Sequence, residues 1–198
     1  AGILISGPFE DNPLDRHHAL VDVNLKGVIN GCVLAKPYLA ATPGACVINL
    51  SSAAAVYGQA SLATYSATKF AVRGLTECLR YNLAPHRIGC SLCCPALTRT
   101  NAWTSALKRP DGFGESGFPE VSRAQLEQFG TAFEEGMDPY EVGARILAGM
   151  TEQRGLILTH PEHGAMKLIY NDARRFGFME LFGDDADSAS LNELGPEP

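Results

Sequence analysis

A tyrosine and a lysine four residues apart are the residues of this sequence whose types and spacing most clearly fit chemistry. Tyr65 is the only one of the six tyrosines that has a lysine four positions later, Lys69. Residues i and i+4 share a face of a helix, so the two side chains would lie together. A tyrosine hydroxyl has an ordinary pKa of about 10, and a nearby lysine cation in a site of low dielectric favours the phenolate. The pair therefore fits acid–base chemistry, although an ordinary pair on a helix surface has the same spacing.

Two further polar residues lie where they could join this pair. Ser52 precedes Tyr65 by thirteen residues and follows a short apolar run that is typical of a buried strand. Ligands of open α/β sheets bind at the carboxyl ends of such strands. Asn24 is a polar residue in an otherwise apolar stretch, and a buried asparagine must find hydrogen-bond partners. Ser52 could instead cap a turn or helix, and Asn24 could be a satisfied amide of the core.

The elements that would position these residues alternate between helix and strand. The strand segments are short, β-branched and almost wholly apolar, which is typical of parallel strands buried on both faces. Such an alternation predicts an α/β fold with a doubly wound parallel sheet. The predicted helices cover residues 12–41, 62–83 and 138–150, and the predicted strands cover residues 45–50, 88–94 and 155–159.

Two of the predicted helices begin with the same signature, a capping residue followed by proline. Asn12 precedes Pro13, and Asp138 precedes Pro139. Asparagine and aspartate are favoured as N-caps, and proline is favoured at the first helical position. The first helix is expected to bend at Pro37.

The arrangement resembles the short-chain dehydrogenase/reductase family from residue 1 to about residue 161. Asn-Leu-Ser-Ser at 49–52 looks like the family's strand-end motif, and Tyr65-Ser-Ala-Thr-Lys69 looks like its Tyr-x-x-x-Lys motif. The resemblance implies that Tyr65 is the general acid/base, that Lys69 lowers its pKa and binds the ribose, and that Ser52 polarises the substrate carbonyl. It also implies that Asn24 holds a water that relays protons to Lys69.

The same resemblance implies a nicotinamide cofactor, NAD or NADP. Residues 94–100 resemble the segment that lies along the nicotinamide, with Ala96 where glycine is usual. The expected cofactor-binding residues are Gly2, Tyr65, Lys69, Pro95, Ala96, Thr98 and Thr100.

The family's Gly-rich phosphate-binding turn has no counterpart in this sequence. Gly112-Phe-Gly-Glu-Ser-Gly117 has the literal spacing but lacks a preceding strand and a following helix start. It fits a flexible lid better. Because Ala1-Gly2 looks like the end of the family's fourth strand, we expect these 198 residues to hold a cofactor poorly and to expose apolar strand residues. Those residues are Val47, Ile48, Leu50 and Leu92.

The charge, the apolar runs and the cysteines of the sequence exclude several classes of protein. The 16 basic and 22 acidic residues give a net charge of −6, which excludes a strongly basic nucleic-acid binder. No apolar run approaches the roughly 20 residues of a membrane span, so we expect a cytoplasmic protein. The six cysteines lie in apolar segments and are expected to be reduced core residues. A metal site is not expected, either at Cys90-x-x-Cys93 or at His160 and His163.

These observations predict a partial Rossmann domain over residues 1–182, with a lid at about 101–137 and a disordered acidic tail at 183–198. The resemblance implies an activity that interconverts a small apolar alcohol and a ketone or aldehyde. It also implies a homodimer or homotetramer paired through the helices of Asn24 and Tyr65. Ala54, Gln59 and Trp103 are candidate substrate contacts. Two alternatives stay open: a catalytically silent segment that binds a partner, and an epimerase or dehydratase that uses the same tyrosine and lysine.

Overall fold

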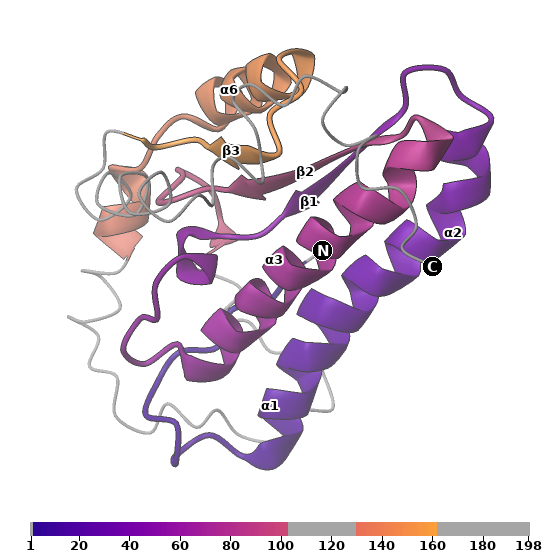
Figure 1. Ribbon diagram of the computed structural model, residues 1–198. Helices are drawn as coiled ribbons and strands as arrows, with labels where there is room; N and C mark the ends of the chain where they lie inside the picture. Colours follow the sequence, from indigo (N-terminus) through magenta and orange to yellow (C-terminus); the bar gives the residue numbers. More distant parts are fainter. Residues whose placement is uncertain (1, 103–129, 162–198) are drawn as a thin grey trace.

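A three-stranded parallel sheet lies between two layers of helices in the computed structural model, which describes residues 2–102 and 130–161 (Figure 1). The helices α1, α2 and α3 cover one face of the sheet, and α6 lies on the other. This arrangement confirms the predicted α/β fold. In chain order the elements are α1 (Leu14–Val21), the π-helix η1 (Asp22–Lys26), α2 (Gly27–Ala40), β1 (Cys46–Leu50), η2 (Ala53–Ala55), α3 (Ala63–Leu83), η3 (Ala84–His86), β2 (Gly89–Cys94), α6 (Pro139–Thr151) and β3 (Leu156–Leu158).

The strands pair in the order β1-β2-β3, so that β2 is the central strand of the described sheet. Leu50 pairs with Cys93, and Cys93 pairs with Ile157, which brings the carboxyl ends of all three strands to one edge. Loops that follow parallel strands at this edge can place side chains from distant parts of the sequence together.

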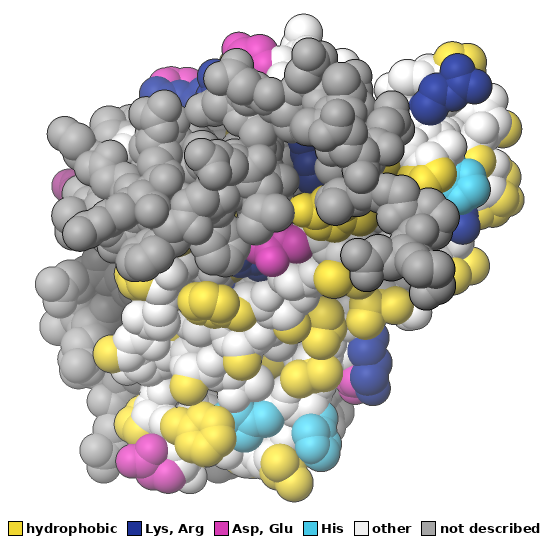
Figure 2. All heavy atoms as spheres, viewed as in Figure 1, with side chains coloured by type: hydrophobic (Ala, Val, Ile, Leu, Met, Phe, Trp, Pro, Cys, Tyr) yellow, Lys and Arg dark blue, Asp and Glu magenta, His cyan; other side chains and the backbone are white. Residues whose placement is uncertain are grey.

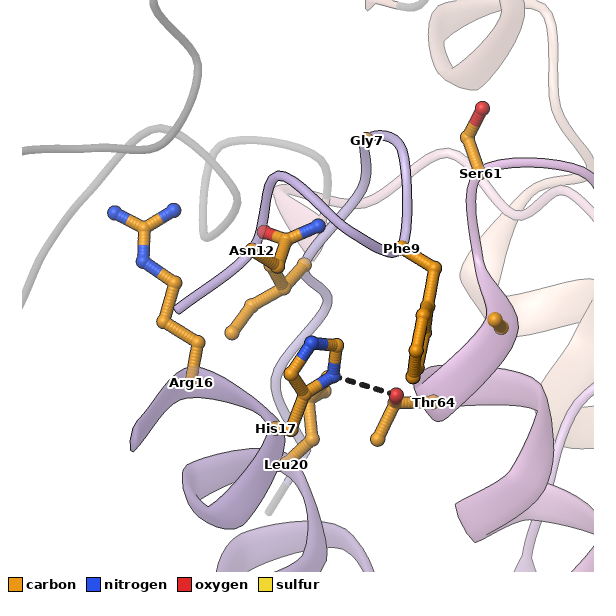
Figure 3. Close-up of a pocket in the computed structure, with 10 residues that line it drawn as sticks. Gly7, Phe9, Asn12, Arg16, His17, Leu20, Ser61 and Thr64 are labelled. Carbon is orange, nitrogen blue, oxygen red and sulfur yellow. Dashed lines mark hydrogen bonds between the residues drawn. The ribbon is translucent and has the colours of Figure 1, made fainter. Parts of the chain in front are cut away.

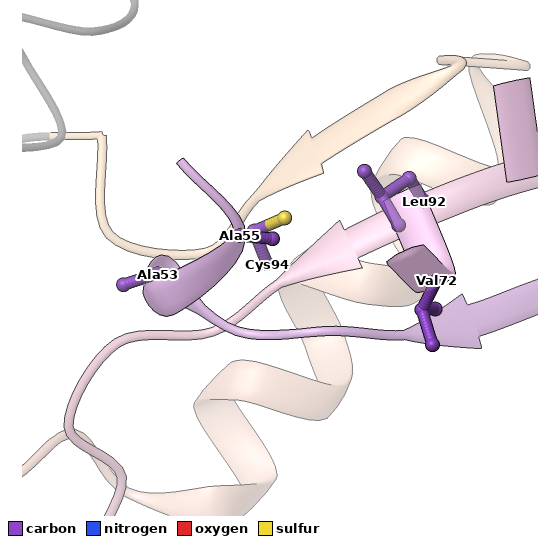
Figure 4. Packing of buried hydrophobic residues seen from close by; sticks show 5 residues of the cluster. All are labelled: Ala53, Ala55, Val72, Leu92 and Cys94. Atoms are coloured by element: carbon purple, nitrogen blue, oxygen red, sulfur yellow. The ribbon is translucent and has the colours of Figure 1, made fainter. Parts of the chain in front are cut away.

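The main core cluster joins β2, η2 and α3 (Figure 4). It consists of Ala53, Ala55, Val72, Leu92 and Cys94. Leu92 is only 1% exposed, so the expectation that it faces water is wrong: its strand is paired on both sides and covered by helices. Leu50, in contrast, is 55% exposed, and Val47 and Ile48 are half-buried.

The first helix begins one residue later than predicted. Pro13 has φ −59° and ψ 148°, which is extended rather than helical, and α1 starts at Leu14. The side chain of Asn12 donates to the carbonyl of Pro8 at 2.8 Å instead of capping the helix. The second signature is confirmed, because the Asp138 side chain accepts from the backbone N–H of Tyr140 at 2.8 Å and Pro139 opens α6.

A single wide π-helical turn separates α1 from α2 and carries Asn24. Such a turn adds one residue to the helical repeat and changes the direction of the side chains within it. Here it turns Asn24 inward, where it has no exposed surface. The helix then continues past Pro37 to Ala40.

The helix α2 is almost wholly apolar and yet has no buried residue. Val33, Leu34 and Tyr38 are 66%, 71% and 77% exposed. Figure 2 shows hydrophobic side chains along the surface over α2 and α3. An apolar surface of this kind marks an interaction site on most soluble proteins.

All six cysteines are free, and their placement corrects part of the prediction. Cys90, Cys93 and Cys94 are buried in β2, and burial raises the pKa of each thiol to about 12. Cys78 is exposed on α3 and therefore is not a core residue. Within residues 2–102 and 130–161, no group of three histidine, cysteine or acidic side chains could hold a metal ion.

No helix in the described part of the chain is both long and apolar enough to cross a membrane. Most of the predicted lid, including Gly112–Gly117, lies outside the described residues. The predicted acidic tail and His163 lie outside them as well.

Candidate active site

Ser52 lies directly beyond the carboxyl end of β1, in a segment that stays attached to the neighbouring strand. The N–H of Ser51 donates to the carbonyl of Cys93 at 2.7 Å, and the N–H of Ala53 donates to the carbonyl of Pro95 at 2.8 Å. The Ser52 hydroxyl accepts from the N–H of Ala54 at 3.2 Å and so caps η2. The capping contact leaves the hydroxyl proton free to donate, so it does not compete with a role toward a substrate.

Tyr65 and Lys69 reach this point from the first turns of α3. The Lys69 Nζ lies 5.5 Å from the centroid of the Tyr65 ring and donates to the carbonyl of Leu50 at 3.4 Å. Ser52 lies close enough to the Tyr65 hydroxyl to act on its pKa. The structure thus brings Ser52, Tyr65 and Lys69 together at the end of β1.

Burial dominates the protonation of the pair. It raises the pKa of the Tyr65 hydroxyl above its ordinary value, and the nearby Ser52 side chain opposes that rise. Burial also lowers the pKa of the Lys69 ammonium, opposed by the nearby Cys94 thiol. Loss of hydration disfavours the charged form of both groups, so the net shift of the Tyr65 pKa is upward. The expected effect of Lys69 on the pKa of Tyr65 stays a prediction. Tyr65 is a phenol at neutral pH.

Ser51 is a site residue that the sequence analysis passed over. Its buried hydroxyl donates to the backbone carbonyl of Lys69 at 2.9 Å. This bond ties the end of β1 to the turn of α3 that carries the lysine, and so fixes the distance between Ser52 and Lys69. The paired serines at the strand end were the available signal, but only the structure shows that the first of them faces the helix.

The side chain of Asn24 is engaged with the segment before α1 rather than with Lys69. Its Oδ1 accepts from the N–H of Ile3 at 2.8 Å, and its Nδ2 donates to the carbonyl of Ile3 at 2.9 Å. The Nδ2 also lies 3.4 Å from the Thr68 hydroxyl. These contacts are those of a satisfied core amide, and the expected water relay from Asn24 to Lys69 stays a prediction.

The expected cofactor segment follows β2 at the same edge of the sheet. Thr98 donates from its hydroxyl to the carbonyl of Ala96 at 3.1 Å, and the Thr100 hydroxyl accepts from the N–H of Ala102 at 3.3 Å. Pro95 is held to Ala53 as described above. Gly2 lies across from Asn24, where a Cβ would stand 3.6 Å from Oδ1.

The three candidate substrate contacts, Ala54, Gln59 and Trp103, differ in how far the structure exposes or describes them. Ala54 has no exposed surface, so its side chain offers nothing to a substrate in this structure. Gln59 is half-buried in the loop before α3. Trp103 lies outside the described residues.

A small pocket lies beside this site, between α1 and the start of α3 (Figure 3). Its volume is about 10 Å³, which is room for about one water molecule. His17 Nδ1 and the Thr64 hydroxyl lie 2.7 Å apart across it, and the rings of Phe9 and His17 have centroids 4.8 Å apart. The pocket is therefore a packing contact next to Tyr65 and too small for a substrate.

A larger groove of about 330 Å³ runs between α2 and β1. Its walls are mainly apolar and contain none of Ser52, Tyr65 and Lys69. The lining residues are Val23, Gly27, Val28, Gly31, Cys32, Ala35, Val47, Ile48, Asn49 and Leu50.

Comparison with known proteins agrees with this geometry. The family model described as short chain dehydrogenase matches residues 1–111. A C alpha-dehydrogenase from Sphingobium sp. is 32% identical over 164 residues, covering 82% of this chain and 53% of that protein. A 3-alpha-(or 20-beta)-hydroxysteroid dehydrogenase from Mycobacterium tuberculosis is 41% identical over 101 residues, covering 50% of this chain and 38% of that protein.

Solved structures show the same likeness. A short chain dehydrogenase/reductase from Burkholderia phymatum in complex with NAD has a TM-score of 0.77 and 27% identity, over 89% of this chain and 64% of that one. The chain spans about half the length of the first of these curated relatives. Since the family model covers more than half of its residues, this chain belongs to the short-chain dehydrogenase family.

Proposed function

We propose that the protein is a nicotinamide-dependent oxidoreductase that interconverts an alcohol and a ketone or aldehyde. The observation that carries the proposal is the grouping of three side chains at the end of β1: the Lys69 ammonium lies 5.5 Å from the centroid of the Tyr65 ring, and Ser52 lies near enough to act on the pKa of the Tyr65 hydroxyl. The relatives reported above are named as dehydrogenases, one of them for hydroxysteroids, which supports a hydroxyl group as the reacting centre.

In the direction of reduction, Tyr65 donates its proton to the substrate oxygen. Its raised pKa keeps the phenol protonated at neutral pH, so the proton is present when it is needed. The Ser52 hydroxyl donates a hydrogen bond to the same oxygen and stabilises the negative charge that develops there. Lys69 stabilises the phenolate that remains until solvent returns the proton. The cofactor, when bound, supplies the hydride that reaches the carbonyl carbon.

The residues around Lys69 fit the sugar and ring end of such a cofactor. The Lys69 ammonium carries three N–H donors, of which the described contacts direct one to Leu50. Hydroxyl groups of a ribose are suitable acceptors for the others. Pro95, Ala96, Thr98 and Thr100 follow β2 at the same sheet edge, with Gly2 nearby. NAD and NADP both stay open, since the segments described here hold no residue that distinguishes them.

A homodimer or homotetramer is part of the proposal. An apolar helix whose residues are all at least partly exposed gains free energy by pairing with another apolar surface. The α2 residues Val33, Leu34 and Tyr38 and the α3 residues Phe70 and Tyr81 provide such a surface. The cytoplasmic location and a small apolar substrate stay predictions.

The alternative is a catalytically silent segment that acts by binding a partner. The observation that favours it is the apolar groove beside β1, together with the 55% exposed Leu50. Both functions leave the fold unchanged, so turnover is what separates them.

The test is a steady-state assay of the purified full-length protein, rather than of these 198 residues alone, with NAD or NADP and a series of apolar secondary alcohols. We expect reduced cofactor to appear with at least one alcohol, and an equal amount of the ketone to be found by mass spectrometry. A folded protein that turns over none of the series with either cofactor would contradict the proposal and favour the silent segment.

A further inference from the structure

The segment that follows β2 is fastened to its surroundings at several points. The N–H of Met137 donates to the carbonyl of Leu97 at 3.0 Å, and the N–H of Arg99 donates to the carbonyl of Met137 at 2.9 Å. Gly136 allows this approach, since a Cβ there would stand 2.9 Å from the Leu97 oxygen. Residues 95–99 are therefore held on one side by backbone hydrogen bonds to Met137.

A buried histidine is hydrogen-bonded to the same segment from the end of another strand. His160 follows β3 and is 6% exposed. Its Nδ1 lies 3.3 Å from the N–H of Ala96, and its Nε2 lies 3.0 Å from the carbonyl of Leu97. One imidazole thus bridges two consecutive residues of the segment from the end of a different strand.

These partners fix the protonation of the ring. A backbone N–H only donates and a backbone carbonyl only accepts, so Nδ1 must accept from Ala96 and Nε2 must carry the proton given to Leu97. The fully buried Thr159 hydroxyl lies 2.8 Å from Nδ1 and can donate to it as well. His160 is therefore a neutral imidazole with one tautomer, held rigidly enough to orient the two peptide groups that it contacts.

We propose that His160 is a positioning residue for the cofactor: it sets the orientation of the Ala96 and Leu97 peptide groups, and these face the nicotinamide end of the cofactor. The inference rests on the proposed function, because residues 95–100 contact a nicotinamide only if the protein binds one. It gives the histidine a role through the backbone, separate from the proton transfer by Tyr65. Loss of the imidazole should then weaken cofactor binding and leave the chemical step nearly intact.

Three substitutions of His160 test its hydrogen bonds to Ala96 and Leu97 separately. In His160→Leu both are lost. In His160→Asn the Oδ1 takes the place of Nδ1 and accepts from Ala96, and in His160→Gln the amide nitrogen takes the place of Nε2 and donates to Leu97. His86, which is exposed in η3, gives the matched control His86→Leu.

The measurements are the dissociation constants of NAD and NADP, kcat, and hydrogen exchange of the amides of residues 96–99 in the intact protein. We expect His160→Leu to weaken the binding of the preferred cofactor about tenfold, with kcat changed less than about threefold. The Asn and Gln variants should lie between it and the wild type, and His86→Leu should match the wild type. Amide exchange at 96–99 should rise in the order of lost affinity.

Three results would overturn the inference in distinguishable ways. Faster exchange at 96–99 in His160→Leu with an unchanged cofactor dissociation constant would refute the positioning role and leave the proposed function standing. Failure of the folded full-length wild type to bind either cofactor would refute both the positioning role and the proposed function. If His160→Leu does not fold, equal affinities of wild type, Asn and Gln variants would be sufficient to refute the role.

Discussion

The end of β1 and the exposed face of α2 use polar and apolar residues in opposite ways. At the end of β1, the side chains of Lys69 and Ser51 are buried and that of Tyr65 is half-buried. The Lys69 ammonium donates to the backbone carbonyl of Leu50. Along α2, the chain places apolar side chains in contact with water and buries none of them. Each choice costs free energy of folding in the isolated chain. The contrast fits the proposals made above, in which the end of β1 takes a small reactant and the face of α2 takes another protein.

Removal of the buried charge is the strongest way to test this contrast. Lys69→Met keeps the volume and removes the ammonium, so we expect kcat/KM to fall by about two orders of magnitude or more. Stability should stay equal or rise by about 1 kcal/mol, because the variant no longer desolvates a charge. Chemical denaturation and steady-state kinetics of the two proteins give both numbers.

The pH dependence of that stability difference sharpens the same point. The pKa of Lys69 is lowered in the folded state, so the wild type recovers stability as the pH rises from the folded pKa toward the unfolded value of about 10.5. The advantage of Lys69→Met should therefore be full below the folded pKa and shrink toward zero at pH about 10.5. An advantage that grows with pH over this range would show that charge burial is not its cause.

A charge on the apolar face should have the next largest effect. Leu34 is 71% exposed on α2, so Leu34→Glu costs the single chain little and places a carboxylate in any interface built on this face. We expect the association constant to fall about a hundredfold, measured by sedimentation equilibrium. Tyr140→Glu, on the 90% exposed Tyr140 of α6, is the control that should leave the α2-paired dimer intact. A wild type that sediments as a monomer at micromolar concentration would remove the basis of this prediction.

The smallest expected effect distinguishes two buried serines near the site. Ser51→Ala removes the bond to the Lys69 carbonyl and should cost about 1 kcal/mol of stability and a several-fold loss in kcat/KM. Ser66 is also buried on α3, but its hydroxyl has no hydrogen-bond partner among the residues that the structure describes. Ser66→Ala should therefore be neutral or slightly stabilising by thermal denaturation. Equal losses for both variants would contradict the role given to Ser51.

The sequence predicted those parts of the molecule that local patterns determine. The strand β1, the helix α3 and the Asp138 cap all depend on neighbours within a few residues, and all three were confirmed. Ser52 follows β1 and Tyr65 lies in the first turns of α3, the next long helix, so both were expected at the carboxyl-end edge of the sheet.

The remaining features depend on contacts between distant segments. The π-turn at Asn24 forms where its side chain meets Ile3, 21 residues away, and the contact of His160 with Ala96 spans 64 residues. No local pattern carries such information. Asn12 was misjudged for a similar reason: the carbonyl of Pro8 competes for the side chain that the helix start would use.

The central claim is that Tyr65 transfers the proton, and one substitution tests it most directly. Tyr65→Phe removes the hydroxyl and leaves the ring over Lys69, whereas Tyr81→Phe makes the same change on the exposed side of α3. With the alcohol and cofactor that the wild type turns over, we predict that Tyr65→Phe lowers kcat at least about a hundredfold with cofactor affinity retained, and that Tyr81→Phe has no effect. Turnover by Tyr65→Phe within a few-fold of the wild type would contradict the account.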